Sequence, residues 1–216
     1  SCSVEVAGVI KGFTALPEIV RTYTECGIRC LASSRIGHLR ALCASGIECE
    51  RFLIRIPMRS ELREVAAYAD MSLASDLETL RMLHAECARQ RRRHKVILML
   101  DLGDLREGFW GVEELLAAAL VVERELDWLE LAGIGTNLGC YGSVAATPEK
   151  MNELVEAAEA VERVIGRKLQ YISGGASTSV HMVLDGTLPE RINQLRVGEF
   201  ALLGGIFGCY PETMYK

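Results

Sequence analysis

The stretch VEVAGVIKGFTALPE (residues 4–18) carries the pattern that decides the fold. An apolar run typical of a buried β-strand, residues 4–10, is followed by a single cation, Lys11. A glycine comes next, and Pro17 then marks the start of an amphipathic helix. The stretch predicts a strand, a short loop that carries a lysine, and a helix.

This order of elements recurs along the chain. Eight short apolar segments are expected to be strands, at residues 4–10, 28–33, 51–57, 70–75, 95–101, 129–135, 169–175 and 192–205. Helical spacing of apolar residues occurs at residues 17–27, 60–69, 76–93 and 148–166. Several of the strand segments are continuously apolar, as in parallel strands that are buried on both faces.

Eight strand–helix units in 216 residues predict an α/β fold, the parallel (β/α)8 TIM-type barrel. A doubly wound sheet is the alternative, but it is disfavoured because the sequence has no glycine-rich dinucleotide loop. No linker-like or low-complexity stretch interrupts the chain, so we expect one domain over residues 1–216. Because the chain opens on a strand and no helix follows its last apolar run, we expect this domain to be incomplete at both ends.

Composition excludes several classes of partner. The formal net charge of −5 argues against a nucleic-acid surface or a basic membrane patch. No apolar run approaches the roughly 20 residues that a membrane span needs. The eight cysteines form no CxxC pair, which predicts reduced thiols in a cytoplasmic protein, and the four histidines lack ligand spacing, so we expect no metal site.

Polar residues follow most of the expected strands. In a barrel, the active site lies where the strands end, at their carboxyl termini. The residues expected there are Lys11, Arg55, Pro57, Ser72, Ser75, Asp101, Arg106, Thr136, Asn137, Ser173, Ser177, Thr178 and Arg196. The last two βα loops are the usual phosphate site of such barrels, and SGGASTS (residues 173–179) and Gly198 supply backbone N–H groups and hydroxyls for an anion.

Lys11 has two interpretations. A lysine at the end of a strand is usually solvated or paired with a carboxylate. At a barrel mouth opposite a phosphate site, a desolvated lysine becomes an amine nucleophile that can form a Schiff base. A lysine, a phosphate site and a central arginine are together what pyridoxal 5′-phosphate (PLP) requires.

Six motifs resemble the alanine racemase-like, fold-type III PLP enzymes, in particular their alanine/ornithine racemase-like branch. They are GVIKG (8–12), ASSRIGHLRAL (32–42), MLDLGDLREG (99–108), GIGTNLGCYG (133–142), SGGASTS (173–179) and INQLRVGEFALLG (192–204). The resemblance implies that Lys11 holds the cofactor and is catalytic, and that Ser177 with the backbone of Gly198 and Glu199 binds its phosphate. It further implies that Arg196 faces the pyridine nitrogen.

Two more cofactor-binding residues follow from the resemblance. Asn137 occupies the position of the histidine that stacks on the cofactor ring in alanine racemases, and Arg106 matches the arginine near the phenolic oxygen. Ala15 stands where the family has a phosphate-binding tyrosine, so one phosphate contact is missing. The C-terminal β-domain of the family is absent or truncated, and with it the tyrosine that acts as second base from the partner subunit. Cys140 and Tyr141 are the candidates for that role in this chain.

The function that the resemblance implies is racemisation of a small-molecule amino acid, of alanine or ornithine type, through the external aldimine, by a homodimer. Asp101, Asp104 and Glu107 could hold a second amino group of the substrate, or pair with Arg55 and Arg106, which we favour. The first alternative is a non-catalytic PLP-binding carrier with the same barrel. The second alternative is a barrel aldolase or epimerase that acts on a phosphorylated substrate and does not use PLP.

Overall fold

The computed structural model describes residues 4–139 and 144–204. Eight parallel strands pair in sequence order, and β8 pairs with β1 to close a barrel. The strands are β1 (Glu5–Val9), β2 (Cys30–Ser33), β3 (Glu50–Leu53), β4 (Met71–Ala74), β5 (His94–Met99), β6 (Leu129–Gly135), β7 (Tyr171–Ala176) and β8 (Gln194–Val197). The predicted TIM-type barrel is confirmed.

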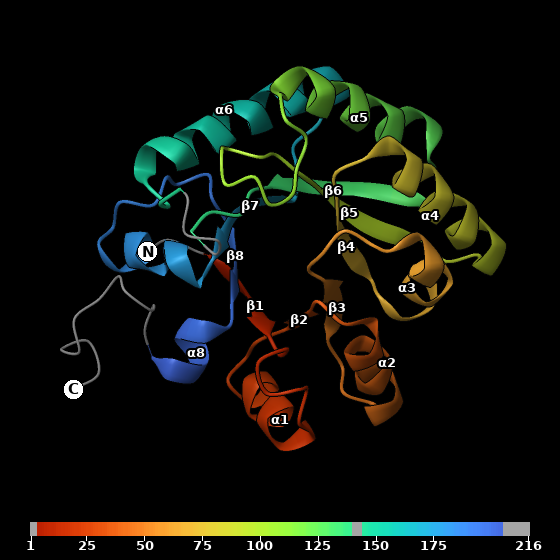
Figure 1. Cartoon of the computed structure of the whole chain (residues 1–216), viewed down its shortest axis with the longest axis vertical. Helices are drawn as coiled ribbons and strands as arrows, with labels where there is room; N and C mark the ends of the chain where they lie inside the picture. Colours follow the sequence, from red (N-terminus) through yellow and green to blue (C-terminus); the bar gives the residue numbers. More distant parts are fainter. Residues whose placement is uncertain (1–3, 140–143, 205–216) are drawn as a thin grey trace.

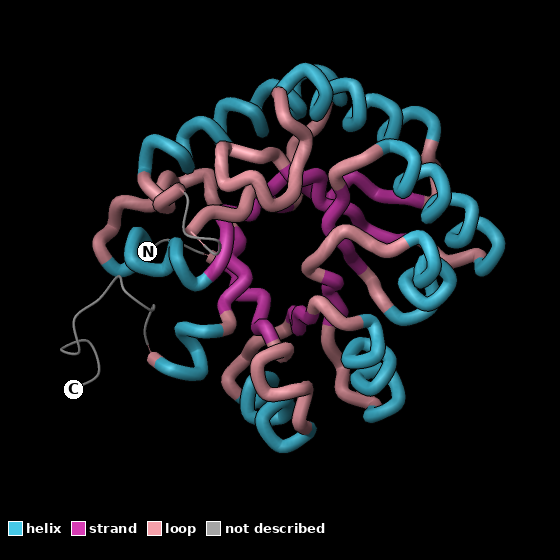
Figure 2. Tube along the Cα trace, viewed as in Figure 1, coloured by secondary structure: helices cyan, strands magenta, loops and turns pink. Residues whose placement is uncertain are grey.

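Helices surround this ring of strands (Figures 1 and 2). They are α1 (Pro17–Glu25), α2 (Ile36–Ser45), α3 (Leu62–Tyr68), α4 (Leu77–Gln90), α5 (Val112–Glu125), α6 (Pro148–Ile165), α7 (Val180–Leu184) and α8 (Glu199–Leu203), with 3-10 turns η1 (Arg59–Glu61) and η2 (Ser177–Ser179). The four predicted helices correspond to α1, α3, α4 and α6. None of the helices in the described part of the chain is both long and apolar enough to cross a bilayer.

Several predicted strand ends shift by a few residues, and two of the shifts matter for the site. The segment expected as one strand over residues 192–205 splits, because β8 ends at Val197 and Glu199 begins the short helix α8. β7 runs to Ala176, one residue past the expected range, so Ser173, which the sequence analysis also grouped with the loop residues, lies inside the strand. Both changes concern the segments that form the expected phosphate site.

Alternating residues of the strands fill the inside of the barrel. This interior cluster consists of Ala7, Val9, Cys30, Ala32, Phe52, Met71, Leu73, Ile97, Met99, Ala132 and Tyr171. The intervening residues pack outward against the helices in a larger, second cluster. Ser72 lies between Met71 and Leu73 and bonds to His94 Nε2 at 2.8 Å, so its hydroxyl is structural and it is not the mouth residue that the sequence predicts.

Asp70 ties the start of β3 to the turn before β4. Its carboxylate accepts two bonds from the Arg51 guanidinium, each of 2.8 Å, and one of 2.9 Å from the Arg51 N–H. Arg92 also donates to it. Burial alone would raise the pKa of Asp70, but the hydrogen bonds from Arg51 and the charge of Arg92 outweigh burial and lower the pKa below its ordinary value.

We expect Asp70→Asn to lower the free energy of unfolding by about 1.5–3 kcal/mol at neutral pH, because it removes charge-assisted hydrogen bonds. The lowered pKa stabilises the fold fully above the unfolded pKa of about 3.9. That contribution is lost as the pH falls through the lower folded value. Thermal melts of wild type and variant should therefore differ at pH 7 and converge below about pH 4. Asp185→Asn, at an exposed carboxylate, is the matched control; a constant difference at every pH contradicts the assignment.

Candidate functional site

Lys11 follows β1 by two residues at the carboxyl end of the barrel, where the sequence places it. Two contacts fix the backbone on either side of it. A Cβ added to Gly198 would lie 2.9 Å from Val9 Cβ, and one added to Gly12 would lie 2.9 Å from Leu202 Cδ1. The lysine is therefore held next to the start of α8.

The Lys11 side chain is exposed, and its ammonium group makes no hydrogen bond or ion pair with any described residue. The sequence analysis expected a desolvated lysine, but the described residues leave the Lys11 side chain exposed to water. The backbone beyond it is tightly turned: Thr14 and Ala15 both have left-handed conformations, with φ of 53° and 57°. Such conformations are unusual for residues with a Cβ and mark a sharply defined loop.

Ser177 forms the centre of a small anion cradle. Its hydroxyl oxygen accepts hydrogen bonds from the N–H groups of Gly198 and Phe200, each of 3.1 Å. Gly198 packs so closely on Val9 that a side chain at this position would displace β1. Both N–H groups are bonded to the Ser177 oxygen here, and a phosphate that took its place as their acceptor would meet two N–H donors and the Ser177 O–H at the start of α8.

The sequence analysis expected the other hydroxyls of the SGGASTS segment to be available to an anion, but two of them are bonded to backbone carbonyls. Thr178 donates to the Leu138 carbonyl at 2.7 Å, and Ser179 donates to the Gly174 carbonyl at 2.7 Å. These bonds link the loop after β7 to the loop after β6 and to β7 itself. The Ser177 hydroxyl is the one that faces the start of α8.

Arg196 is 4% exposed and lies inside the barrel mouth on β8. Its guanidinium donates to the Ser173 hydroxyl and, at 2.6 Å, to the Thr136 carbonyl oxygen. The planar group is therefore held in one orientation by β7 and by the end of β6. Sequence reasoning identified Arg196 but missed these two anchors; the alternation of residues along β7 was the one signal that could place Ser173 inside.

Arg106, Glu107 and Asn137 form a chain of polar contacts above β5 and β6. Asn137 Nδ2 donates to Glu107 Oε1 at 2.7 Å, and Arg106 Nε lies 3.4 Å from Glu107 Oε2. The predicted pairing of Arg106 with an acidic residue of its own loop is confirmed. The predicted pairing of Arg55 is wrong, because Arg55 bonds to Glu61 instead.

Asp101 and Asp104 serve the backbone of the loop after β5. Asp101 Oδ1 accepts from the N–H groups of Gly103 and Leu105, at 2.8 and 3.2 Å. Asp104 is 3% exposed and accepts from the Val144 N–H at 3.3 Å. These carboxylates shape the loop. Cys140 and Tyr141, the candidates for a second base, lie outside the described residues.

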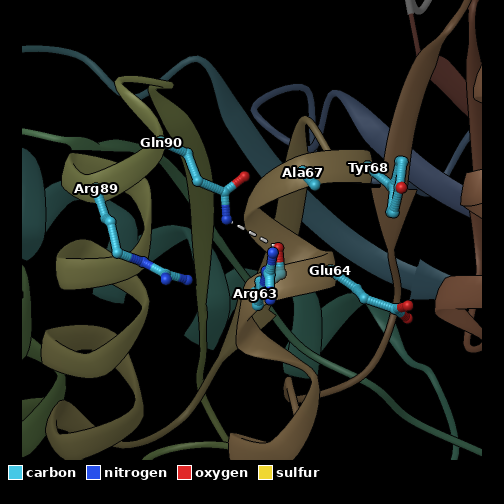
Figure 3. Close-up of a pocket in the computed structure, with 6 residues that line it drawn as sticks. All are labelled: Arg63, Glu64, Ala67, Tyr68, Arg89 and Gln90. Atoms are coloured by element: carbon cyan, nitrogen blue, oxygen red, sulfur yellow. Dashed lines mark hydrogen bonds between the residues drawn. The ribbon is translucent and has the colours of Figure 1, made fainter.

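A surface pocket lies away from this mouth, between α3 and α4 (Figure 3). Gln90 on α4 donates to the Arg63 carbonyl on α3 at 2.9 Å across it. Two of its charged side chains have partners on the surface, since Glu64 pairs with Arg40 and Arg89 pairs with Glu86. The pocket is a groove between two packed helices, and the polar groups described above remain the candidate site.

Fold and site together define a class: (β/α)8 barrels with an anion cradle after the last two strands and a lysine at the end of the first. The sequence profile described as "Alanine racemase, N-terminal domain" matches residues 3–205. The chain belongs to this family.

Two curated relatives cover 93% of the chain. One is the ornithine racemase of Acetoanaerobium sticklandii, 37% identical over 200 residues, and the other is the lysine racemase of Thermotoga maritima, 35% identical over 204 residues. The matches cover 56% and 55% of those proteins. The chain therefore spans about half the length of the curated relatives that it matches.

Solved structures share the fold. The alanine racemase of Clostridium difficile 630, in complex with cycloserine, superposes with a TM-score of 0.78 at 18% identity, over 98% of this chain and 57% of that one. PipY of Synechococcus elongatus with PLP bound gives 0.73 at 18% identity, over 92% of both chains. At these identities the likeness concerns the barrel alone.

Proposed function

We propose that this chain is the PLP-binding barrel of an amino-acid racemase that acts on a basic amino acid such as ornithine or lysine. The single observation that carries the proposal is the position of Lys11 beside the anion cradle. The lysine lies between Val9, which contacts Gly198, and Gly12, which contacts α8. The names of the two curated relatives support racemisation and a basic substrate.

The residues present fit PLP. The Ser177 hydroxyl and the N–H groups of Gly198 and Phe200 supply donors of the kind that a phosphate needs. Arg196 is a buried cation with a fixed plane, as a ring nitrogen would need for a directed hydrogen bond. Glu199 lies at the same turn, and the family resemblance assigns Arg106 and Asn137 to the surroundings of the cofactor ring.

Once bound, PLP supplies the aldehyde and the electron-withdrawing ring that make the substrate Cα–H acidic. Lys11 carries out the proton transfer on one face, taking the Cα proton and returning one to the same carbon. Arg196 would hold the ring nitrogen through a hydrogen bond, and a guanidinium would not give up its proton to that nitrogen. This role of Arg196 would favour return of the proton to the substrate Cα over transamination.

Racemisation also needs a proton donor on the opposite face of Cα. The family resemblance assigns that role to a tyrosine from the C-terminal domain of the partner subunit in a homodimer. Within this chain, Cys140 and Tyr141 remain the alternatives. The homodimer and the cytoplasmic location both stay predictions.

The proposal is tested with the full-length protein, loaded with PLP, in deuterated water. Incubation with L-ornithine, L-lysine and L-alanine in separate arms, followed by NMR, measures loss of the Cα proton, and chiral chromatography measures inversion. We expect exchange with inversion for at least one of the two basic amino acids. Exchange of L-alanine alone would contradict the basic substrate, and no exchange in any arm would contradict the racemase.

The second candidate function is a PLP-binding protein without catalysis. It is favoured by the match to PipY, whose chain is covered to 92% by the barrel alone. Such a protein would bind PLP through Lys11 and Ser177 but leave the Cα proton of all three amino acids in place. The exchange experiment therefore separates the two functions.

We expect Ser177→Ala to weaken PLP binding by about 10–150-fold, since one hydrogen bond to a charged group is worth roughly 1.5–3 kcal/mol. Binding of phosphate-free pyridoxal should change little, because Ser177 serves the phosphate. Fluorescence titration of both ligands measures the difference. Thr24→Ala, on exposed α1, is the matched control; equal weakening of both ligands in Ser177→Ala would show that the cradle is structural.

A further inference from the structure

The opposite end of the barrel carries a second polar cluster that the proposed function does not use. Glu5, Cys30 and Glu50 are the first residues of the neighbouring strands β1, β2 and β3. One ligand atom from each, two carboxylate oxygens and a thiol sulfur, all lie within 4.8 Å of one another. This is the amino end of the strands, whereas Lys11 and Arg196 lie at the carboxyl end.

The cluster has more negative than positive charge. Lys95 donates to Glu50 Oε1 at 2.9 Å, and the Tyr171 hydroxyl donates to Glu50 Oε2 at 3.5 Å. Among the described residues, Lys95 is the one cation bonded to Glu50, while Glu5 is a second carboxylate in the cluster. The two carboxylates repel each other at this distance. A further positive charge would relieve this repulsion.

Gln194 provides an independent observation at the same place. It is 0% exposed, and neither its amide nitrogen nor its amide oxygen has a hydrogen-bond partner among residues 4–139 and 144–204. Gln194 on β8 is in register with Glu5 on β1, so the two side chains lie side by side on the inner face of the barrel. An unpaired buried amide costs on the order of 1–3 kcal/mol, which a ligand would offset.

We propose that Glu5, Cys30 and Glu50 bind one thiophilic divalent cation of the zinc type, with the Gln194 amide oxygen as fourth ligand. A thiolate with oxygen donors suits Zn²⁺ and excludes Mg²⁺ and Ca²⁺, which take oxygen ligands alone. Zn–S and Zn–O bonds are about 2.3 and 2.0–2.2 Å long, so one ion can bridge ligand atoms that lie within 4.8 Å of one another once the side chains close in on it. The metal–sulfur bond forms as the Cys30 proton leaves to solvent, and Lys95 keeps its bond to Glu50.

The test is a titration of the full-length, PLP-loaded protein with Co²⁺, recorded as difference spectra. We expect one equivalent to bind, with thiolate-to-cobalt charge transfer and the visible bands of a four-coordinate site. Zn²⁺ should displace the cobalt, and an excess of Mg²⁺ should not. Because the readout is metal binding at the end of the barrel away from Lys11, its failure leaves the proposed function intact.

Two variants make the test specific. Cys30→Ser should remove the charge-transfer band, and Glu5→Gln, which keeps the size of the side chain and removes its charge, should weaken binding. Loss of an outer-sphere partner already costs about 10–100-fold in affinity, so loss of a ligand should cost at least as much. Cys87→Ser, at a buried cysteine on α4, is the matched control and should bind normally. Absence of stoichiometric binding in the wild type, or binding that survives both variants, overturns the proposal.

Discussion

Lys11→Ala should abolish the borohydride-reducible link to PLP and reduce racemisation by roughly 10²–10⁴-fold, the usual contribution of a positioned proton-transfer group. The effect is large because one amine both anchors the cofactor and moves the Cα proton. The fold should be unaffected, since the exposed ammonium makes no bond with the described residues and its removal leaves the contacts of Gly12 in place. Absorbance of the bound cofactor, the Cα exchange rate and the melting temperature measure the three outcomes.

Lys150→Ala is the matched control for Lys11→Ala. Lys150 lies on α6, and its ammonium group pairs with Glu153 at 3.0 Å on the surface. It should retain full cofactor loading and activity. If Lys11→Ala kept the reducible link at the wild-type yield, another amine would be the attachment site and the assignment of Lys11 would be wrong.

Arg196→Gln should lower the racemisation rate by roughly 10²–10³-fold, the cost of removing one preorganised donor from an active site. It should also destabilise the protein by about 1–3 kcal/mol, because the Ser173 hydroxyl and the Thr136 carbonyl lose a buried charged donor. The position of the guanidinium inside the mouth is the reason for both effects. Steady-state kinetics at saturating PLP and denaturant unfolding measure them separately.

Arg191→Gln serves as control for Arg196→Gln. Arg191 approaches β8 on the outside of the barrel and pairs with Glu162 at 2.7 Å. Its loss should cost stability and leave the rate at saturating PLP unchanged. If the Arg196→Gln enzyme kept the wild-type turnover, Arg196 would have no role in catalysis, whether or not the variant is less stable than the wild type.

Much of the barrel follows from local sequence. Short apolar runs alternating with helical spacing define its strands and four of its helices. The helices α2 and α5 were missed because their pattern is weak: α5 contains the nearly continuous apolar run LLAAALVV (residues 115–122), which shows no clear stripe. The split between β8 and α8 was missed because apolar residues resume at Phe200 after Gly198 and Glu199, so the segment reads as one largely apolar run.

The site residues, like the elements of the fold, are only partly predictable from local sequence. Lys11, Ser177 and Arg196 are identifiable because each follows or ends a recognisable strand. Their anchors are not, since the bond from Arg196 to the Thr136 carbonyl joins residues 60 positions apart and depends on the register of the strands. The cluster of Glu5, Cys30 and Glu50 is invisible for the same reason: no local spacing links three residues that meet through strand pairing.

The most direct test of the central claim is to map the residue that binds the cofactor. The full-length protein is incubated with PLP, reduced with borohydride and digested, and the pyridoxyl-bearing peptide is identified by mass spectrometry. The account predicts a single modification, on Lys11, that Ser177→Ala reduces at limiting PLP. Modification of Lys95, Lys150 or Lys168 in its place, or of no lysine at all, would contradict it.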